Sequence, residues 1–278
     1  MATRSRGIVT VAALDLRRRP DHRSELRSQL LMGETVRVLG TAGRGQWWLV
    51  RNDVDGYRGW VRSWGLTSAT PAEARRWTAA ATAQARLSFV EVREGRGRGP
   101  LVSPLFWQAR VIVRRRAGKW SRVQLPDGRQ GWVPSRALTP GSRRPTLERR
   151  IQSLLGLPYS WGGRTPSGFD CSGFVQQVMA EQGIDLPRDA DEQRRATTEL
   201  GPGDRPRRGD LVFFGPKRGR LTHVGILLGG GRFAHAQGQV AIGTLDDSNP
   251  LYNKRLHDIL RGFGRPLWPP RGGGAHSC

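Results

Sequence analysis

The chain has 278 residues and a formal net charge of +23 at pH 7. This length suffices for about two domains, or three small ones, and the only cysteines, Cys171 and Cys278, are too few for a disulfide scaffold. Nearly all the positive charge is arginine spread along the whole chain, which argues against a nucleic-acid-binding stripe as the main role.

No stretch reaches the roughly 20 apolar residues of a membrane-spanning helix. The apolar run near the N-terminus is short and interrupted by Asp15, unlike the core of a secretory signal. We therefore expect a cytoplasmic protein that binds no membrane. A secreted or wall-associated protein, from which an export signal was removed, is the alternative. The glycine-rich end, 268–278, is expected to be a disordered tail.

Two segments in the N-terminal half repeat each other, GQWWLVRNDVDGYRGWVRSWGL (45–66) and GKWSRVQLPDGRQGWVPSRAL (118–138). Each carries an Asp-Gly pair between alternating apolar runs, which predicts a hairpin turn between short strands. The strands before them are ETVRVLG and ARVIVRR. This pattern predicts two small antiparallel barrels and resembles bacterial SH3-like (SH3b) domains, at 1–70 and 71–140. Such modules either position the rest of the chain or touch its substrate.

A turn-rich segment, TPGSRRP (139–145), leads into a third domain, 141–267. There an apolar stripe at helical spacing predicts an amphipathic helix that Gly156 ends, formed by Leu147, Ile151, Leu154 and Leu155.

The stretch SGFDCSGFVQQVM (167–179) predicts a second helix, with Asp170 as its N-cap and Cys171 in its first turn. Unpaired backbone N–H groups and the helix dipole favour an anion there. We therefore expect a lowered thiol pKa and an activated nucleophile at Cys171. An inert buried cysteine is the alternative, unless a base lies nearby.

The sequence LTHVGILLGGGRFAHAQG (221–238) predicts a hairpin that carries His223 and His235. If its three consecutive glycines, 229–231, form the loop, Leu228 pairs with Arg232 and both imidazoles lie on one face of the sheet. A loop of even length would separate them.

In the catalytic interpretation, His223 takes the proton of the Cys171 thiol and His235 orients the His223 ring. An open zinc site formed by the same three residues is the alternative. Zinc ligands are usually more closely paired in sequence, so we expect no metal and no cofactor.

Six segments in order, PYSWGG, FDCSGF, LPRDADEQ, RRGDLVFFG, THVGILLGGG and FAHAQG, resemble the NlpC/P60 family of papain-like cysteine peptidases over about residues 147–265. The resemblance implies an α+β fold, with helices packed on an antiparallel sheet, preceded by two all-β SH3-like barrels. It also implies Cys171 as nucleophile, His223 as general base and His235 as the third residue.

The arrangement of two SH3b domains before the catalytic domain resembles the γ-D-glutamyl-L-diamino acid endopeptidases. That similarity implies that Tyr159 lies near the oxyanion and that Asp189 binds the free α-ammonium of an N-terminal L-Ala. Asp170 and Ser172 would line the D-Glu subsite, although Asp170 serves equally well as a helix cap alone. Further candidates for substrate contact are Trp64, Arg164 and Arg188.

We therefore expect a cysteine endopeptidase that hydrolyses the bond between γ-D-Glu and diaminopimelate or Lys in peptidoglycan stem peptides with a free N-terminal L-Ala, during muropeptide recycling. Its partner would be the peptide L-Ala-γ-D-Glu-diamino acid, with no nucleic acid, and the chain would be a monomer. The alternatives are a secreted hydrolase of intact peptidoglycan and a non-catalytic protein that binds cell wall or nucleic acid.

Overall fold

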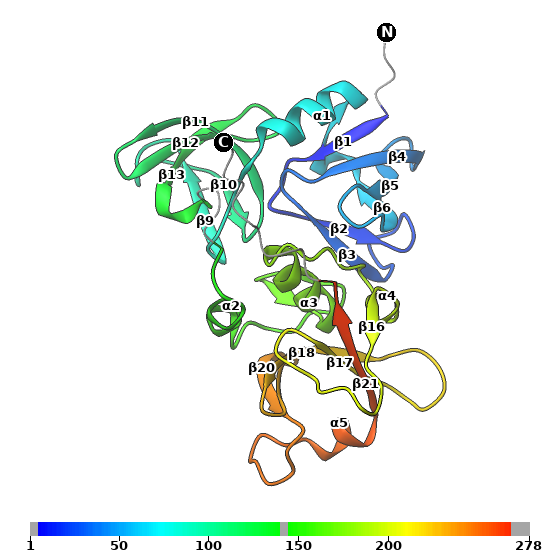
Figure 1. Ribbon diagram of the computed structural model, residues 1–278. Helices are drawn as coiled ribbons and strands as arrows, with labels where there is room; N and C mark the ends of the chain where they lie inside the picture. Colours follow the sequence, from blue (N-terminus) through cyan, green and yellow to red (C-terminus); the bar gives the residue numbers. More distant parts are fainter. Residues whose placement is uncertain (1–4, 140–143, 268–278) are drawn as a thin grey trace, which may run out of the picture.

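The computed structural model describes residues 5–139 and 144–267, so the tail predicted at 268–278 lies outside the described residues. Two β units lie at one end of the molecule and an α+β unit at the other (Figure 1). The expected fold class, two all-β units before helices packed on an antiparallel sheet, is confirmed. Within the described ranges, no helix has the length and apolar character needed to cross a membrane.

The first β unit is a seven-stranded sheet with the order β3-β2-β6-β5-β4-β1-β7. Its strands are β1 (Arg6–Val9), β2 (Ala13–Arg17), β3 (Leu26–Leu31), β4 (Thr35–Ala42), β5 (Trp47–Asn52), β6 (Arg58–Arg62) and β7 (Leu66–Ala69), with a 3-10 turn at Ser63–Gly65. The predicted Asp-Gly turn joins β5 to β6, and Gly56 takes the left-handed φ of 71° that this turn requires.

The second β unit is a six-stranded sheet with the order β10-β9-β13-β12-β11-β8. Its strands are β8 (Ala83–Gln84), β9 (Phe89–Arg93), β10 (Leu101–Phe106), β11 (Arg110–Ala117), β12 (Trp120–Gln124) and β13 (Gln130–Pro134), followed by a 3-10 turn at Ser135–Ala137. The second Asp-Gly pair joins β12 to β13, so the repeat in the sequence is a repeat in structure.

Helix α1 (Pro71–Ala80) connects the two sheets. Thr70 and Glu73 form a capping box at its start, and Pro71 occupies its first turn, where proline costs no hydrogen bond. Trp77 packs on the first sheet, and its indole Nε1 donates to the carbonyl of Gly33 at 2.9 Å. The helix therefore belongs by packing to the first β unit.

The α+β unit is built on a six-stranded sheet with the order β16-β21-β17-β18-β19-β20. Its elements are α2 (Leu147–Leu154), β14 (Arg164–Thr165), β15 (Gly168–Phe169), α3 (Cys171–Glu181), α4 (Ala190–Arg195), β16 (Thr197–Glu199), β17 (Leu211–Phe214), β18 (His223–Gly229), β19 (Arg232–Gln237), β20 (Gln239–Thr244), α5 (Lys254–Asp258) and β21 (Leu260–Pro266). The two helices predicted from apolar spacing are α2 and α3, and both are confirmed.

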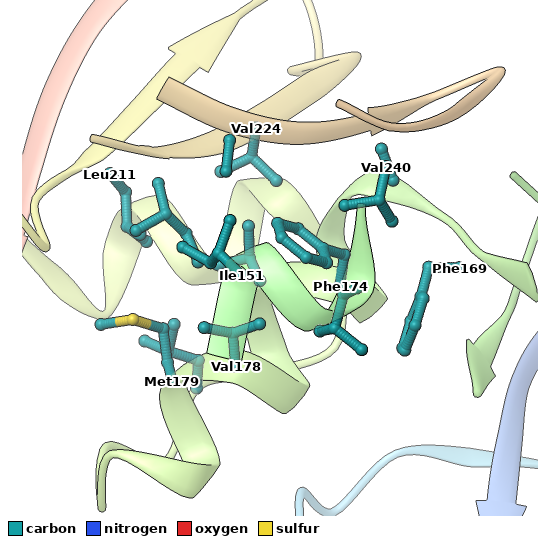
Figure 2. Close-up of a cluster of buried hydrophobic side chains, with 14 of the residues drawn as sticks. Ile151, Phe169, Phe174, Val178, Met179, Leu211, Val224 and Val240 are labelled. Atoms are coloured by element: carbon teal, nitrogen blue, oxygen red, sulfur yellow. The ribbon is translucent and has the colours of Figure 1, made fainter. Parts of the chain in front are cut away.

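Helix α3 is held by the largest apolar cluster of the unit (Figure 2). Four apolar residues of this helix are fully buried: Phe174, Val175, Val178 and Met179. They pack against α2 and against the sheet residues Leu211, Val224 and Val240. Each buried aliphatic or aromatic side chain contributes about 1.5–3 kcal/mol relative to exposure. The position of the α3 N-terminus over the sheet is therefore strongly fixed.

A buried ion pair links α2 and α3 to the second β unit. Arg150 donates from Nη2 and Nε to the two carboxylate oxygens of Glu181, at 2.6 and 2.7 Å. The same carboxylate accepts from Nε1 of Trp107 at 3.0 Å, and the guanidinium carbon lies 4.4 Å from the centroid of that ring. Because both charged side chains are almost completely buried, loss of one partner leaves the other without solvation.

We predict that Arg150→Met lowers the free energy of unfolding by about 3 kcal/mol or more, since it leaves Glu181 charged and buried. Thermal unfolding followed by circular dichroism measures the loss as a lower melting temperature. The control is Arg149→Met, which changes the exposed neighbouring arginine. Equal melting temperatures for the two variants would contradict a stabilising role for the Arg150–Glu181 ion pair.

Candidate active site

A cleft of about 620 Å³ opens at the junction between the first β unit and the α+β unit. All the predicted site residues belong to the α+β unit, and all of them line the cleft except His223 and His235. The first β unit contributes one wall. The lining residues are Arg18, Glu25, Arg27, Tyr57, Tyr159, Trp161, Asp170, Cys171, Ser172, Arg188, Asp189, Ala190, Asp191, Arg220, Leu221 and Thr222.

Cys171 is the first residue of α3, as predicted, and Asp170 is the N-cap. The Oδ1 atom of Asp170 accepts from the backbone N–H of Gly173 at 2.7 Å, which satisfies one of the unpaired donors of the first turn. A Cβ atom on Gly173 would lie 2.2 Å from the carbonyl oxygen of Gly163. Only glycine therefore lets the helix start approach the preceding turn this closely.

The histidine hairpin brings both imidazoles together on one face, as predicted, but its loop differs from the predicted one. Ile226 pairs with Ala234, so the expected register holds along β18 and β19. Gly229, however, pairs with Arg232, which leaves a two-residue turn instead of three glycines. A bulge between Leu227 and Gly229 inserts the extra residue. The bulge restores the parity that an even loop alone would have broken.

The two imidazoles meet inside this sheet. Nε2 of His223 lies 2.8 Å from Nδ1 of His235, and the rings are nearly perpendicular. Burial lowers the pKa of His223 to about 3, with a further contribution from His235, and burial lowers the pKa of His235 to about 4. Both rings are therefore neutral near pH 7. If His223 donates from Nε2 to His235, its Nδ1 is free to accept a proton.

Cys171 lies close to β18, because its side chain packs against the apolar cluster that contains Val224, the residue after His223. The expectation of a lowered thiol pKa is wrong for the free protein. Burial, and secondarily the carboxylate of Asp170, raise the pKa of Cys171 to about 11, against the lowering effects of the Val224 N–H and Arg188. Desolvation outweighs the helix N-terminus as long as His223 is neutral.

Asp170 and Ser172 line the cleft, but their polar atoms are already engaged. The Asp170 carboxylate accepts from Gly162 N–H at 2.9 Å and from Nη1 and Nη2 of Arg188 at 3.0 and 2.6 Å. Ser172 Oγ accepts from Arg188 Nη1 at 2.8 Å. This saturation favours the interpretation of Asp170 as a helix cap and structural anchor.

Tyr159 lines the cleft beside Cys171. Burial, with added repulsion from Cys171 and Asp170, raises the pKa of Tyr159 to about 12, so the phenol is neutral. Within residues 5–139 and 144–267 its hydroxyl makes no hydrogen bond. It is therefore available as a donor to a bound ligand.

Asp189 has a partner that the sequence did not predict. The hydroxyl of Tyr57, from the first β unit, donates toward both carboxylate oxygens at 3.0 and 3.1 Å. Asp189 is the N-cap residue of α4, yet its side chain makes no capping hydrogen bond. The guanidinium of Arg27 lies 4.9 Å from the Tyr57 ring centroid. Tyr57 directly follows the first Asp-Gly turn, and this position at a hairpin tip was the only signal in the sequence.

Of the other substrate-contact candidates, only Arg188 lines the cleft, and its guanidinium is already bound by Asp170 and Ser172. Trp64 is exposed but does not line the cleft. Arg164 is buried and pairs with Glu34 at 3.2 Å, and Arg188 is buried against Asp170 and Ser28. Both arginines thus hold the first β unit against the α+β unit, and their charges are already compensated. Within the described ranges, no group of three or more His, Cys, Asp or Glu side chains is arranged to hold a metal ion.

Comparison with known proteins identifies two families along the chain. The NlpC/P60 family model matches residues 156–261, and the model of the bacterial dipeptidyl-peptidase Sh3 domain matches residues 16–66. The γ-D-glutamyl-L-lysine dipeptidyl-peptidase of Bacillus subtilis is 30% identical over 251 residues, which cover 86% of this chain and 81% of the relative.

Two further matches agree. Dipeptidyl-peptidase 6 of Lysinibacillus sphaericus is 31% identical over 157 residues, covering 52% of this chain and 56% of the relative. The crystal structure of an NlpC/P60 family protein from Bacillus cereus covers 95% of this chain and 100% of its own, with a TM-score of 0.79 at 22% identity. The last is a likeness of fold.

The buried neutral histidines predict a pH dependence of stability. Unfolded histidine has a pKa near 6.5, whereas folded His223 remains neutral down to about pH 3. Below pH 6.5 the unfolded chain therefore binds a proton that the folded chain does not. The free energy of unfolding decreases as the pH is lowered. Urea unfolding at pH 7 and pH 4.5 should show wild type losing about 2 kcal/mol more than His223→Gln. His22→Gln, at an exposed position, should lose as much as wild type.

Proposed function

Because the chain belongs to the NlpC/P60 family and is a cysteine peptidase, we propose that it hydrolyses the bond between γ-D-Glu and the following diamino acid in peptidoglycan stem peptides with a free N-terminal L-Ala. The names of its relatives from Bacillus subtilis and Bacillus cereus, both γ-D-glutamyl-L-lysine dipeptidyl-peptidases, support this reaction. The reaction releases the dipeptide L-Ala-γ-D-Glu.

The observation that carries the proposal is the state of Asp189. A structural N-cap aspartate satisfies the first turn of its helix, as Asp170 does. Asp189 leaves that turn uncapped, and one phenol from the neighbouring domain is its hydrogen-bond partner. A carboxylate with unused acceptor sites in a cleft suits a ligand ammonium. An acylated L-Ala nitrogen carries no charge and would leave this partly desolvated carboxylate unpaired.

In the proposed reaction the proton of the Cys171 thiol passes to Nδ1 of His223 as the sulfur–carbon bond forms. The sulfur attacks the γ-carbonyl carbon of D-Glu, an S–C bond forms, and the carbonyl electrons move to oxygen. His223, now cationic, still donates from Nε2 to the neutral His235. The proton then passes to the leaving amine as the C–N bond breaks. Water, deprotonated by His223, hydrolyses the thioester and regenerates the thiol.

The tetrahedral oxyanion would be stabilised at the start of α3. The backbone N–H of Cys171 belongs to the first helical turn and has no acceptor within the helix. The neutral hydroxyl of Tyr159, which also lines the cleft, would provide a second donor. Fixed donors of this kind typically contribute about 10²–10³ in rate each.

The first β unit supports a role on small released peptides. It supplies Tyr57 to Asp189 and lines the same cleft with Arg18, Glu25 and Arg27. This wall lies on the Asp189 side and would block a substrate whose L-Ala is still joined to a glycan strand. We therefore assign the enzyme to muropeptide recycling, and accordingly to the cytoplasm.

Cys171→Ala is predicted to abolish hydrolysis of L-Ala-γ-D-Glu-diaminopimelate, because no other group in the cleft can form the thioester. Mass spectrometry of the products measures turnover, and circular dichroism checks the fold. Cys278→Ala serves as the matched cysteine control and should keep full activity. Hydrolysis of the peptide by Cys171→Ala at the wild-type rate would refute the proposed mechanism.

Asp189→Asn is predicted to lower kcat/KM for the free peptide about 30-fold or more, since removal of one member of a desolvated charge pair costs roughly 2 kcal/mol or more. The slow hydrolysis of the N-acetylated peptide should not change. The control Asp185→Asn alters an exposed carboxylate in the preceding loop. If wild type hydrolyses both peptides equally well, recognition of the free ammonium is wrong.

A further inference from the structure

Four arginine side chains line the active-site cleft, and three of them have an acidic partner. The three ion pairs join Arg18 to Glu25 at 3.7 Å, Arg188 to Asp170 at 2.6 Å and Arg220 to Asp191 at 3.1 Å. The fourth arginine is Arg27. In the part of the chain that the structure describes, the guanidinium of this half-buried residue makes no ion pair and no hydrogen bond. Its charge is therefore available to an anion that enters the cleft.

Arg27 is the extra residue of a β-bulge. Two consecutive residues of β2 pair with Leu26 and Ser28 of β3, which leaves Arg27 without a partner on β2. A bulge breaks the alternation of side chains along a strand and redirects the side chain of the extra residue. Both neighbours are held by the α+β unit. Nε of Arg188 donates to Oγ of Ser28 at 3.0 Å, and a Cβ atom on Gly162 would lie 2.5 Å from the carbonyl oxygen of Leu26. The backbone that carries Arg27 is therefore fixed against the catalytic unit.

The Arg27 guanidinium also stacks on the ring whose hydroxyl holds Asp189. Its central carbon lies 4.9 Å from the centroid of the Tyr57 ring, and the hydroxyl of Tyr57 donates to both carboxylate oxygens of Asp189. A guanidinium that covers a ring with its flat face keeps its N–H donors, which lie in its own plane, for other acceptors. One tyrosine therefore contacts a negative group through its hydroxyl and a positive group through its face.

These two charges match the dipeptide end of the proposed substrate. The L-Ala residue carries an ammonium group, and D-Glu keeps a free α-carboxylate because its γ-carboxyl forms the bond that is hydrolysed. A single peptide bond joins the two residues, so their Cα atoms lie about 3.8 Å apart and the two charged groups are neighbours. The carboxylates of the diamino acid lie beyond the reacting carbonyl. With the ammonium at Asp189, the nearest substrate anion to Arg27 is thus the α-carboxylate of D-Glu.

We propose that Arg27 binds the α-carboxylate of D-Glu and makes the enzyme select stem peptides in which this carboxylate is free over those in which it is amidated. The inference rests on the proposed function and adds a specificity-determining residue from the first β unit. A carboxylate accepts two parallel N–H bonds from a guanidinium, whereas a carboxamide offers one oxygen and no charge. An amidated substrate would therefore leave Arg27 without compensation inside the closed cleft.

Two peptides that differ in one group test the proposal. They are L-Ala-γ-D-Glu-L-Lys and the same peptide with an α-carboxamide on D-Glu, and mass spectrometry of the released lysine gives kcat/KM for each. We expect wild type to prefer the free carboxylate about 30-fold, the typical effect of removing one member of a desolvated charge pair. The preference should disappear in Arg27→Met. In Arg27→Lys, which keeps the charge but not the paired donors, it should be intermediate.

The matched control is Arg23→Met, which removes an exposed arginine of the preceding loop and should keep the wild-type preference. Circular dichroism reports whether each variant is folded. If wild type hydrolyses both peptides equally well, or if folded Arg27→Met keeps the preference, the role of Arg27 is wrong and the proposed function stands. If wild type hydrolyses neither peptide, the proposed function is wrong and the role of Arg27 is rejected with it.

Discussion

The active-site region depends on one buried ion pair, Arg188 with Asp170, in which both carboxylate oxygens accept from the guanidinium. Asp170 caps α3 and so fixes the proposed nucleophile, while Nε of Arg188 reaches Ser28 of the first β unit at 3.0 Å. One interaction thus sets both the start of the catalytic helix and the position of the domain that forms the opposite wall. Removing either partner would leave a charge without compensation beside the sulfur, which typically costs several kcal/mol.

The two N-cap aspartates of the cleft differ in how many of their hydrogen-bond acceptor sites are already occupied. Asp170 and Asp189 stand one residue before a helix and line the same cleft. The first has its acceptor sites filled by backbone and arginine donors, so it has little left to offer a ligand. The second holds a single phenol and leaves its own helix uncapped. Both match the N-cap preference in sequence, and only their partners from distant segments distinguish them.

The sequence predicted what local periodicity controls. The apolar stripes gave α2 and α3, the Asp-Gly pairs gave two hairpins, and the parity of the glycine hairpin put both histidines on one face. Prediction from the sequence failed where contacts between distant segments determine the structure. The bulge near Leu228, the contact of Tyr57 with Asp189 and the burial of Arg164 against Glu34 each depend on packing that no short window contains. The raised pKa of Cys171 is of the same kind, since helix position is local but desolvation is not.

A neutral third residue has a chemical consequence for this dyad. An aspartate in the place of His235 would stabilise the imidazolium form of His223 and favour a resting thiolate. Neutral His235 accepts a hydrogen bond but supplies no charge, and burial keeps the pKa of His223 near 3 while that of Cys171 is near 11. In the proposed mechanism the proton therefore rests on sulfur in the free enzyme, and its transfer to His223 is coupled to formation of the bond between sulfur and carbon. In this proposal, charge then develops on the substrate oxygen and is stabilised by the start of α3 and the hydroxyl of Tyr159. On this proposal, the thiol stays protonated until a substrate carbonyl occupies the cleft.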